Sequence, residues 1–158
     1  MGEQVVTLRD VREEDLPIFC EHQMDPAGIQ MAAFTPDLPY EPAAYMARLR
    51  KNLANESVIQ KTILSNAQVI GSIACYGPPE EREVTYWLGT EYWGRGLATR
   101  ALEQFIPLCG RPLYARAAKD NLGSIRVLEK CGFRRIGEET SFANARGREI
   151  EEVIYRLG

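Results

Sequence analysis

The alternation of apolar and polar side chains divides this chain into short strands and a few helices. Runs rich in β-branched and aromatic residues predict strands, whereas apolar residues that recur every three or four positions predict helices. The predicted strands are 5–9, 58–65, 69–76, 83–88, 112–118, 133–138 and 150–157. The predicted helices begin near Glu13 and cover 42–55, 97–109 and 121–130.

This order of elements predicts an α/β fold with a mixed, mostly antiparallel sheet of about seven strands and four helices. Residues 66–68 are a predicted hairpin connection and residues 141–147 a polar loop. The interval 24–42 contains four prolines and is not expected to form a long regular helix. We interpret it as a packed connection or as one wall of a substrate site. A length of 158 residues fits a single domain, 1–158.

The composition excludes several classes of function. A net charge of −3 gives no strong attraction to nucleic acid or to an anionic membrane. No basic-then-apolar leader and no apolar run of about 20 residues occur, so we expect a cytoplasmic protein. The four cysteines form no CxxC pair and no histidine lies near any pair of them, which favours reduced, buried thiols and no metal site.

The clearest candidate for chemistry is the turn between the predicted strand 83–88 and the helix that begins at Leu97. Gly94 and Gly96 in this turn would let an anion approach the backbone, and the first N–H groups of the helix lack internal partners. The motif is not a P-loop, because no Lys-Ser/Thr pair follows it. It is not a dinucleotide fingerprint, because Thr99 stands where a third glycine or alanine is required. A plain tight turn is the alternative.

Two motifs resemble the GNAT superfamily of N-acetyltransferases. The first is Gly94-Arg95-Gly96-Leu97-Ala98-Thr99, which is similar to the family's acetyl-CoA loop, with Trp93 at the position usually held by Gln or Arg. The second is the stretch 121–133, whose Asn, Ser, Glu-Lys and Gly-Phe pattern resembles the branch of ribosomal-protein N-terminal acetyltransferases. Both motifs occur in the family's order, with a helix and a strand between them.

The resemblance implies a fold in which the fourth and fifth strands splay apart and the pantetheine arm of acetyl-CoA occupies the gap. It implies that acetyl-CoA is a cosubstrate, that no metal takes part, and that a backbone N–H near Leu88 stabilises the oxyanion. The residues implied to bind acetyl-CoA are Leu88, Trp93, Gly94, Arg95, Gly96, Leu97, Ala98, Thr99, Asn121 and Ser124.

The stretch 83–88 resembles the strand that often carries the catalytic glutamate in this branch, so Glu83 is the candidate base. An ordinary carboxylate is a weak base for an ammonium, and we therefore expect it to act through water. A solvated edge glutamate is the alternative. His22, the only histidine, is expected at the surface of the first helix. Leu128 stands where many members have a tyrosine acid, so Ser124 or a water could be the proton donor, or the CoA thiolate could leave unassisted.

The sequence thus predicts an acetyltransferase that acts on a primary amine, with a protein or peptide N-terminus as the preferred acceptor. A small-molecule acceptor such as an aminoglycoside, polyamine or amino acid is one alternative. A non-catalytic acyl-CoA-binding sensor is another. We expect a monomer or a homodimer that binds neither nucleic acid nor membranes.

Overall fold

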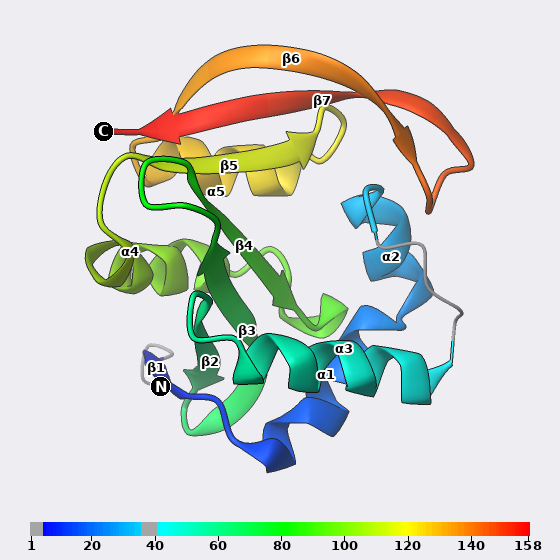
Figure 1. The fold of residues 1–158 in the computed structure, drawn as a ribbon, viewed down its shortest axis with the longest axis vertical. Helices are drawn as coiled ribbons and strands as arrows, with labels where there is room; N and C mark the ends of the chain where they lie inside the picture. The colour runs from blue at the N-terminus through cyan, green and yellow to red at the C-terminus, as the bar shows by residue number, and fades with distance from the viewer. Residues whose placement is uncertain (1–4, 36–40) are drawn as a thin grey trace.

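The computed structural model describes residues 5–35 and 41–158, which build a seven-stranded sheet in the order β1-β2-β3-β4-β5-β7-β6 (Figure 1). All neighbouring strands are antiparallel except β4 and β5, which are parallel. The strands are β1 (Val6–Asp10), β2 (Ile59–Ser65), β3 (Gln68–Tyr76), β4 (Arg82–Leu88), β5 (Leu113–Ala118), β6 (Arg134–Ala143) and β7 (Arg148–Leu157). The predicted mixed, mostly antiparallel sheet is confirmed.

The parallel contact between β4 and β5 is short. Only two register pairs join these strands, Arg82 with Leu113 and Glu83 with Tyr114, and beyond them the strands diverge. Backbone groups of β4 after Glu83 therefore face a gap instead of a partner strand. This is the splay between the fourth and fifth strands that the resemblance implied.

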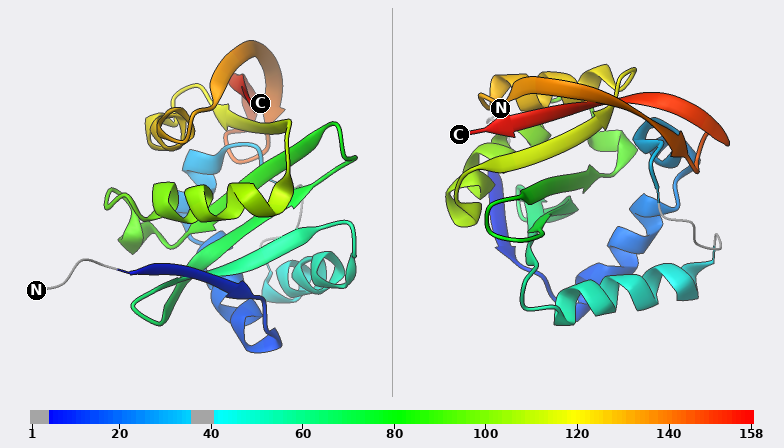
Figure 2. Two further views of the ribbon diagram at one scale, coloured as in Figure 1. Left: turned by 90° about the vertical axis from the view of Figure 1, so that its left-hand side faces the viewer. Right: turned by 45° about the horizontal axis from the view of Figure 1, so that its top comes forward.

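Within the described residues, five α-helices cover the sheet: α1 (Leu16–Gln23), α2 (Pro26–Ala32), α3 (Pro42–Ala54), α4 (Leu97–Cys109) and α5 (Leu122–Lys130). Short 3₁₀ helices η1 (Glu13–Asp15) and η2 (Thr90–Tyr92) precede α1 and α4. Helix α4 lies against one face of β1–β4, and α1 and α3 pack together on the opposite side (Figure 2).

The apolar spacing of α4 explains its position. Leu97, Ala101, Leu102 and Phe105 fall on one stripe of this helix and are all at most 1% exposed, in one cluster with apolar side chains of the sheet. Helices α1 and α3 bury a second, smaller cluster that contains Phe19 and Leu49. The first turn of α4 is thereby held firmly at the C-terminal end of β4.

A buried carboxylate ties η1 to the sheet. Asp15 is 1% exposed and accepts two hydrogen bonds from the Arg9 guanidinium, at 2.7 and 2.9 Å. It also accepts the Arg12 N–H at 2.8 Å and the Thr62 hydroxyl at 2.8 Å. These four donors hold the pKa of Asp15 at about 2, although burial alone would raise it.

Two predictions about secondary structure were wrong. The interval 24–42, which was not expected to form a long regular helix, contains the short helix α2, so the described residues have five α-helices and not the predicted four. Pro26 starts this helix, since its missing N–H is not needed in the first turn, and Asp25 caps it by accepting the Ala27 N–H at 3.0 Å. The part of this interval at 36–40 lies outside the described residues.

The polar loop predicted at 141–147 begins too early. Strand β6 continues to Ala143, because residues 140–143 pair with residues 148–151 of β7 in a long polar ladder. Polar and apolar side chains do not alternate regularly in this stretch, so the sequence pattern did not indicate a strand there. Among residues 5–35 and 41–158, no helix has both the length and the apolar character needed to cross a membrane.

Candidate active site

The loop between η2 and α4 has the geometry of an anion site. Gly94 and Gly96 adopt φ values of 75° and 74°, in the left-handed region that favours glycine. A Cβ built on either would meet nothing within 4 Å, so the space above both glycines is open. No side chain caps α4 at Gly96, which leaves the first N–H groups of this helix available at the positive end of its dipole.

A cavity, here called the loop cavity, lies beside this turn. Its walls come from α2, the C-terminal end of β4, the turn itself and α5. Arg126 and Lys130 stand one helical turn apart on α5 and contribute positive charge to its wall. The arrangement combines exposed helix N–H groups, open glycine backbone and two cations, which suits a phosphate-bearing ligand with an apolar arm.

A second cavity, the carboxylate cavity, extends along the gap between β4 and β5 toward α3. Glu83 lies in its wall, with Tyr76 of β3 on one side and Arg116 of β5 on the other. The Arg116 Nε lies 3.9 Å from the Glu83 Oε1, while its Nη1 binds Glu139 at 2.8 Å and Glu152 at 3.1 Å. Three carboxylates thus surround one guanidinium.

The surroundings of Glu83 make it a better base than a solvated carboxylate. Its side chain is 27% exposed, and burial raises its pKa above the ordinary value. The charge of Arg116 and a hydrogen bond from Tyr76 oppose this rise, and Glu152 adds to it. Burial and the neighbouring Glu83 in turn raise the pKa of Tyr76 to about 12, so its phenol stays neutral and can donate.

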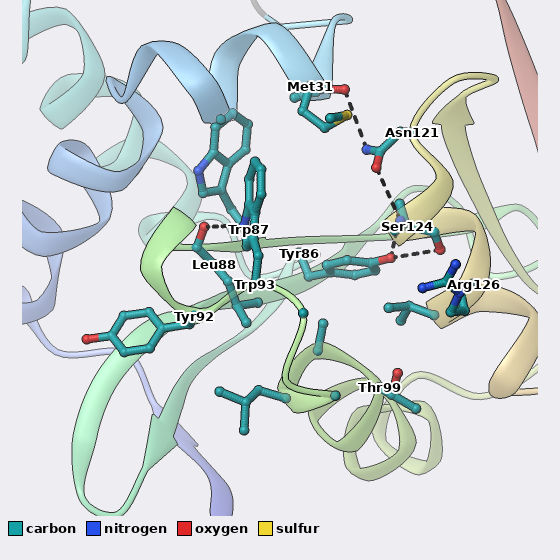
Figure 3. A pocket seen from close by; sticks show the side chains of 18 of the residues that line it. Met31, Tyr86, Trp87, Leu88, Tyr92, Trp93, Thr99, Asn121, Ser124 and Arg126 are labelled. Atoms are coloured by element: carbon teal, nitrogen blue, oxygen red, sulfur yellow. Dashed lines mark hydrogen bonds between the residues drawn. The ribbon is translucent and has the colours of Figure 1, made fainter.

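The two cavities meet at a junction formed by Tyr86, Trp87, Asn121 and Ser124, with Ala32 beside them; all five line both cavities. Figure 3 shows Tyr86 reaching from β4 to α5, where its hydroxyl lies 2.7 Å from the Ser124 hydroxyl. A ligand in one cavity can therefore contact a ligand in the other at these side chains.

Backbone and side-chain hydrogen bonds fix the junction. The Asn121 side chain accepts the Ser124 N–H at 3.2 Å, which caps α5, and donates to the Met31 carbonyl of α2 at 3.5 Å. The Trp87 indole donates to the His22 carbonyl at 3.0 Å. Gly28 of α2 lies against this indole, where a Cβ would approach to 3.2 Å.

Most of the predicted binding residues lie together. Those that line the loop cavity are Leu88, Trp93, Gly94, Gly96, Leu97, Ala98, Thr99, Asn121 and Ser124. Arg95 is exposed and is not among the residues lining this cavity. Glu83 lies in the carboxylate cavity, which Ser124 also lines from the junction, so the candidate base and the candidate donor share this cavity.

His22 does not have the exposed position expected of it. It is half-buried, its Nδ1 has no hydrogen-bond partner among the described residues, and burial lowers its pKa. Its ring lies against Gly89, where an added Cβ would approach the Nε2 to 2.9 Å. Leu128 is 1% exposed and packs in the main cluster, as its apolar character predicts.

Sequence reasoning missed the contributions of α2 and the contact between Tyr86 and Ser124. Gly28 and Met31 line the loop cavity, but they lie in a segment for which no helix was predicted. Arg126 and Lys130 carried a usable signal, since they recur at i and i+4 after Gly123 on one helix. Within the described residues, no group of three or more His, Cys, Asp or Glu side chains is arranged to hold a metal ion.

Comparison with known proteins agrees with this geometry. A family model described as an acetyltransferase (GNAT) domain matches residues 6–134. An uncharacterized N-acetyltransferase p20 from Bacillus licheniformis is 25% identical over 163 aligned positions, which cover 96% of this chain and 92% of that protein.

Solved structures share the fold at low sequence identity. The ribosomal L7/L12 α-N-protein acetyltransferase RimL, in complex with coenzyme A, superposes with a TM-score of 0.82 at 16% identity, over 96% of this chain and 93% of that one. Spermidine N-acetyltransferase from Vibrio cholerae, in complex with CoA and spermine, gives 0.76 at 17% identity, over 96% and 95%.

Proposed function

The chain belongs to the GNAT acetyltransferase family, and from this premise we propose that it transfers acetyl from acetyl-CoA to a primary amine by direct attack. One observation carries the proposal: a cavity suited to a phosphate-bearing donor and a cavity containing a half-buried carboxylate meet at a junction lined by Tyr86 and Ser124. Direct transfer between two bound substrates requires such a meeting point.

The loop cavity fits the donor. The uncapped N–H groups of Leu97, Ala98 and Thr99 would hold pyrophosphate oxygens, with the open backbone at Gly94 and Gly96 allowing close approach. Trp93 and Leu88 give the cavity an apolar wall for the pantetheine arm, beside Asn121. Arg95 would contact phosphate from outside the cavity.

In the carboxylate cavity, Glu83 would accept the proton of the acceptor's ammonium through a water, since amines attack only when neutral. The nitrogen then attacks the thioester carbon, the carbon–sulfur bond breaks, and sulfur leaves with the bonding electron pair. A backbone N–H near Leu88 would stabilise the oxyanion, and Ser124 would face the leaving sulfur.

We propose a protein or peptide N-terminal amine as the acceptor. The sequence motif at 121–133 and the fold shared with RimL, a ribosomal L7/L12 α-N-protein acetyltransferase, support this choice. One observation favours a small polycationic amine instead. The single positive charge of Arg116 is surrounded by three carboxylates, Glu83, Glu139 and Glu152, so this part of the cavity carries an excess of negative charge. A spermidine N-acetyltransferase shares the fold.

The test combines binding and turnover. Acetyl-CoA is titrated calorimetrically, and thiol release is then followed with N-terminal peptides, polyamines, aminoglycosides and amino acids. Glu83→Gln is expected to keep acetyl-CoA affinity and to lose at least about a hundredfold in turnover, the usual contribution of a general base. Glu81→Gln, which changes an exposed carboxylate two residues away, is the matched control and is expected to behave as wild type.

Each outcome discriminates between the candidates. Full activity in Glu83→Gln would remove Glu83 as the base. Binding without thiol release from any amine would favour a non-catalytic acyl-CoA sensor. Absence of acetyl-CoA binding would refute the assignment of the loop cavity.

A further inference from the structure

Tyr86 brings a phenol to α5, the helix on which this sequence lacks the family's usual tyrosine. Leu128 occupies that helical position and is buried in the apolar core. Tyr86 instead approaches α5 from the opposite wall, and its hydroxyl lies 2.7 Å from the Ser124 Oγ and 3.4 Å from the Ser124 carbonyl oxygen (Figure 3).

Both partners in this contact are held in place. Ser124 lies in the first turn of α5, where its N–H is bound by the Asn121 side chain that caps the helix. The ring of Tyr86 packs against the main apolar cluster, so the phenol has little freedom to turn away. A hydroxyl–hydroxyl distance of 2.7 Å is that of a well-formed O–H···O bond.

We propose that Tyr86 and Ser124 form one hydrogen-bond donor unit for the leaving sulfur of acetyl-CoA, in which Tyr86 is the positioning residue and Ser124 contacts the sulfur. The proposal rests on the proposed function. Either hydroxyl could donate across this 2.7 Å contact. In the proposed unit the Tyr86 hydroxyl donates and the Ser124 Oγ accepts, which leaves the serine hydrogen to point into the junction shared by the two cavities.

The proton balance of the step is complete. As the carbon–sulfur bond breaks, sulfur takes the electron pair and accepts the hydrogen bond of Ser124. If the proton follows, the serine oxygen recovers one from Tyr86, and the phenol is reprotonated from solvent. The ammonium gives one proton to Glu83 before the attack, and the nitrogen gives a second proton to solvent as the tetrahedral intermediate collapses. Glu83 returns its own proton to solvent, so the products are a neutral amide and a thiol.

The state of the phenol agrees with this role. Burial raises the pKa of Tyr86 to about 12, against a partial lowering by the bond to Ser124. The hydroxyl is therefore protonated throughout the neutral range and remains a donor. A serine hydroxyl that receives this bond is polarised toward its own acceptor, as in other chains of hydrogen bonds.

The test compares CoA with desulfo-CoA, which lacks the sulfur but keeps every other binding group. Affinities are measured calorimetrically at pH 7.5 and pH 9 for the wild type, Tyr86→Phe, Ser124→Ala and the double variant. The wild type is expected to prefer CoA, more strongly at pH 9, where the thiol ionises. At pH 9, Tyr86→Phe is expected to bind CoA about tenfold more weakly, which is the usual loss when a hydrogen bond to a charged group is removed. Its affinity for desulfo-CoA is expected to be unchanged.

The matched control is Tyr155→Phe, which removes a phenol that hydrogen-bonds Glu129 away from both cavities. It is expected to bind both ligands as the wild type does. The two single variants are also expected to be non-additive, because either change breaks the same unit.

Three results would overturn the proposal: an equal loss for CoA and desulfo-CoA in Tyr86→Phe, no loss for either, or additive losses in the double variant. If Tyr86→Phe fails to fold, Ser124→Ala decides, since it must lose the preference for CoA. A wild type that prefers CoA but releases no thiol with any amine would refute the proposed function and leave the sulfur contact standing.

Discussion

Arg116 is predicted to set the pH at which Glu83 becomes a competent base. Its guanidinium lies 3.9 Å from the Glu83 carboxylate and is held there by Glu139 and Glu152. Arg116→Gln removes the positive charge and keeps a polar side chain. Without that charge the ionised form of Glu83 is less favoured, so the pKa of Glu83 rises further. As the pH is lowered, the carboxylate is then protonated at a higher pH than in the wild type.

The magnitude follows from the distance and the exposure. Two unit charges 3.9 Å apart interact by about 1 kcal/mol in water and about 4 kcal/mol at an effective dielectric constant of about 20. The Arg116 side chain is 38% exposed and shares its charge among three carboxylates, which places the effect in the lower part of this range. A value of about 1.4 kcal/mol corresponds to about one pH unit.

The assay is the pH dependence of kcat/KM, measured by thiol release from pH 5 to pH 9. The acid limb, where activity falls as Glu83 is protonated, is expected to move upward by about one pH unit in Arg116→Gln. Tyr76 and Glu152 also face Glu83 and are unchanged in this variant. Arg50→Gln serves as the control, because it breaks an exposed ion pair between Arg50 of α3 and Glu13 of η1.

An acid limb that stays in place would refute the reasoning, provided that Glu83→Gln is inactive. It would mean that another group controls the limb or that solvent screens Arg116 completely. A downward movement would contradict the sign of the interaction itself.

The remaining predictions concern the buried carboxylate and the glycine turn. Asp15→Asn is expected to lower the free energy of unfolding by about 3 kcal/mol, because Arg9 loses a buried partner. The wild-type carboxylate has a pKa of about 2, so its contribution of about 2 kcal/mol is present above pH 4 and is lost as the pH falls toward 2. Urea titrations at pH 7 and pH 3 measure both effects, and an equal acid slope in the variant would contradict them. Gly96→Ala is expected to lower acetyl-CoA affinity by about tenfold or more, as a methyl group enters the phosphate space. Gly147→Ala places the same methyl at another open position of positive φ and controls for backbone strain; equal affinities in calorimetry would exclude the turn as the phosphate site.

The sequence predicted the elements whose side chains have a clear period. The stripe of α4, the alternation of Val153 and Tyr155 in β7 and the hairpin at 66–67 all follow from local patterns, and the structure has each of them. The glycine turn was equally accessible, because two glycines between a strand and an amphipathic helix constrain the backbone locally.

Features that depend on tertiary contacts were not accessible in this way. The prolines of 24–42 indicated a break, yet Pro26 starts a helix whose Gly28 packs on the Trp87 indole. The half-buried position of His22 also depends on a contact that is distant in sequence, because its ring lies against Gly89. The pairing of Tyr86 with Ser124 joins residues 38 positions apart, and no local pattern encodes which strand residue faces α5.

The two register pairs between β4 and β5 leave the sheet as two antiparallel halves, β1–β4 and β5–β7–β6. A substrate in the gap contacts both halves, because both cavities have walls from β4 and from the segment that includes β5 and α5. Binding and unfolding are therefore linked. A ligand at a concentration of about 100 times its Kd adds about 2.7 kcal/mol to the free energy of unfolding. A bound substrate that contacts both halves would join them across the gap and would contribute to the stability of the whole sheet.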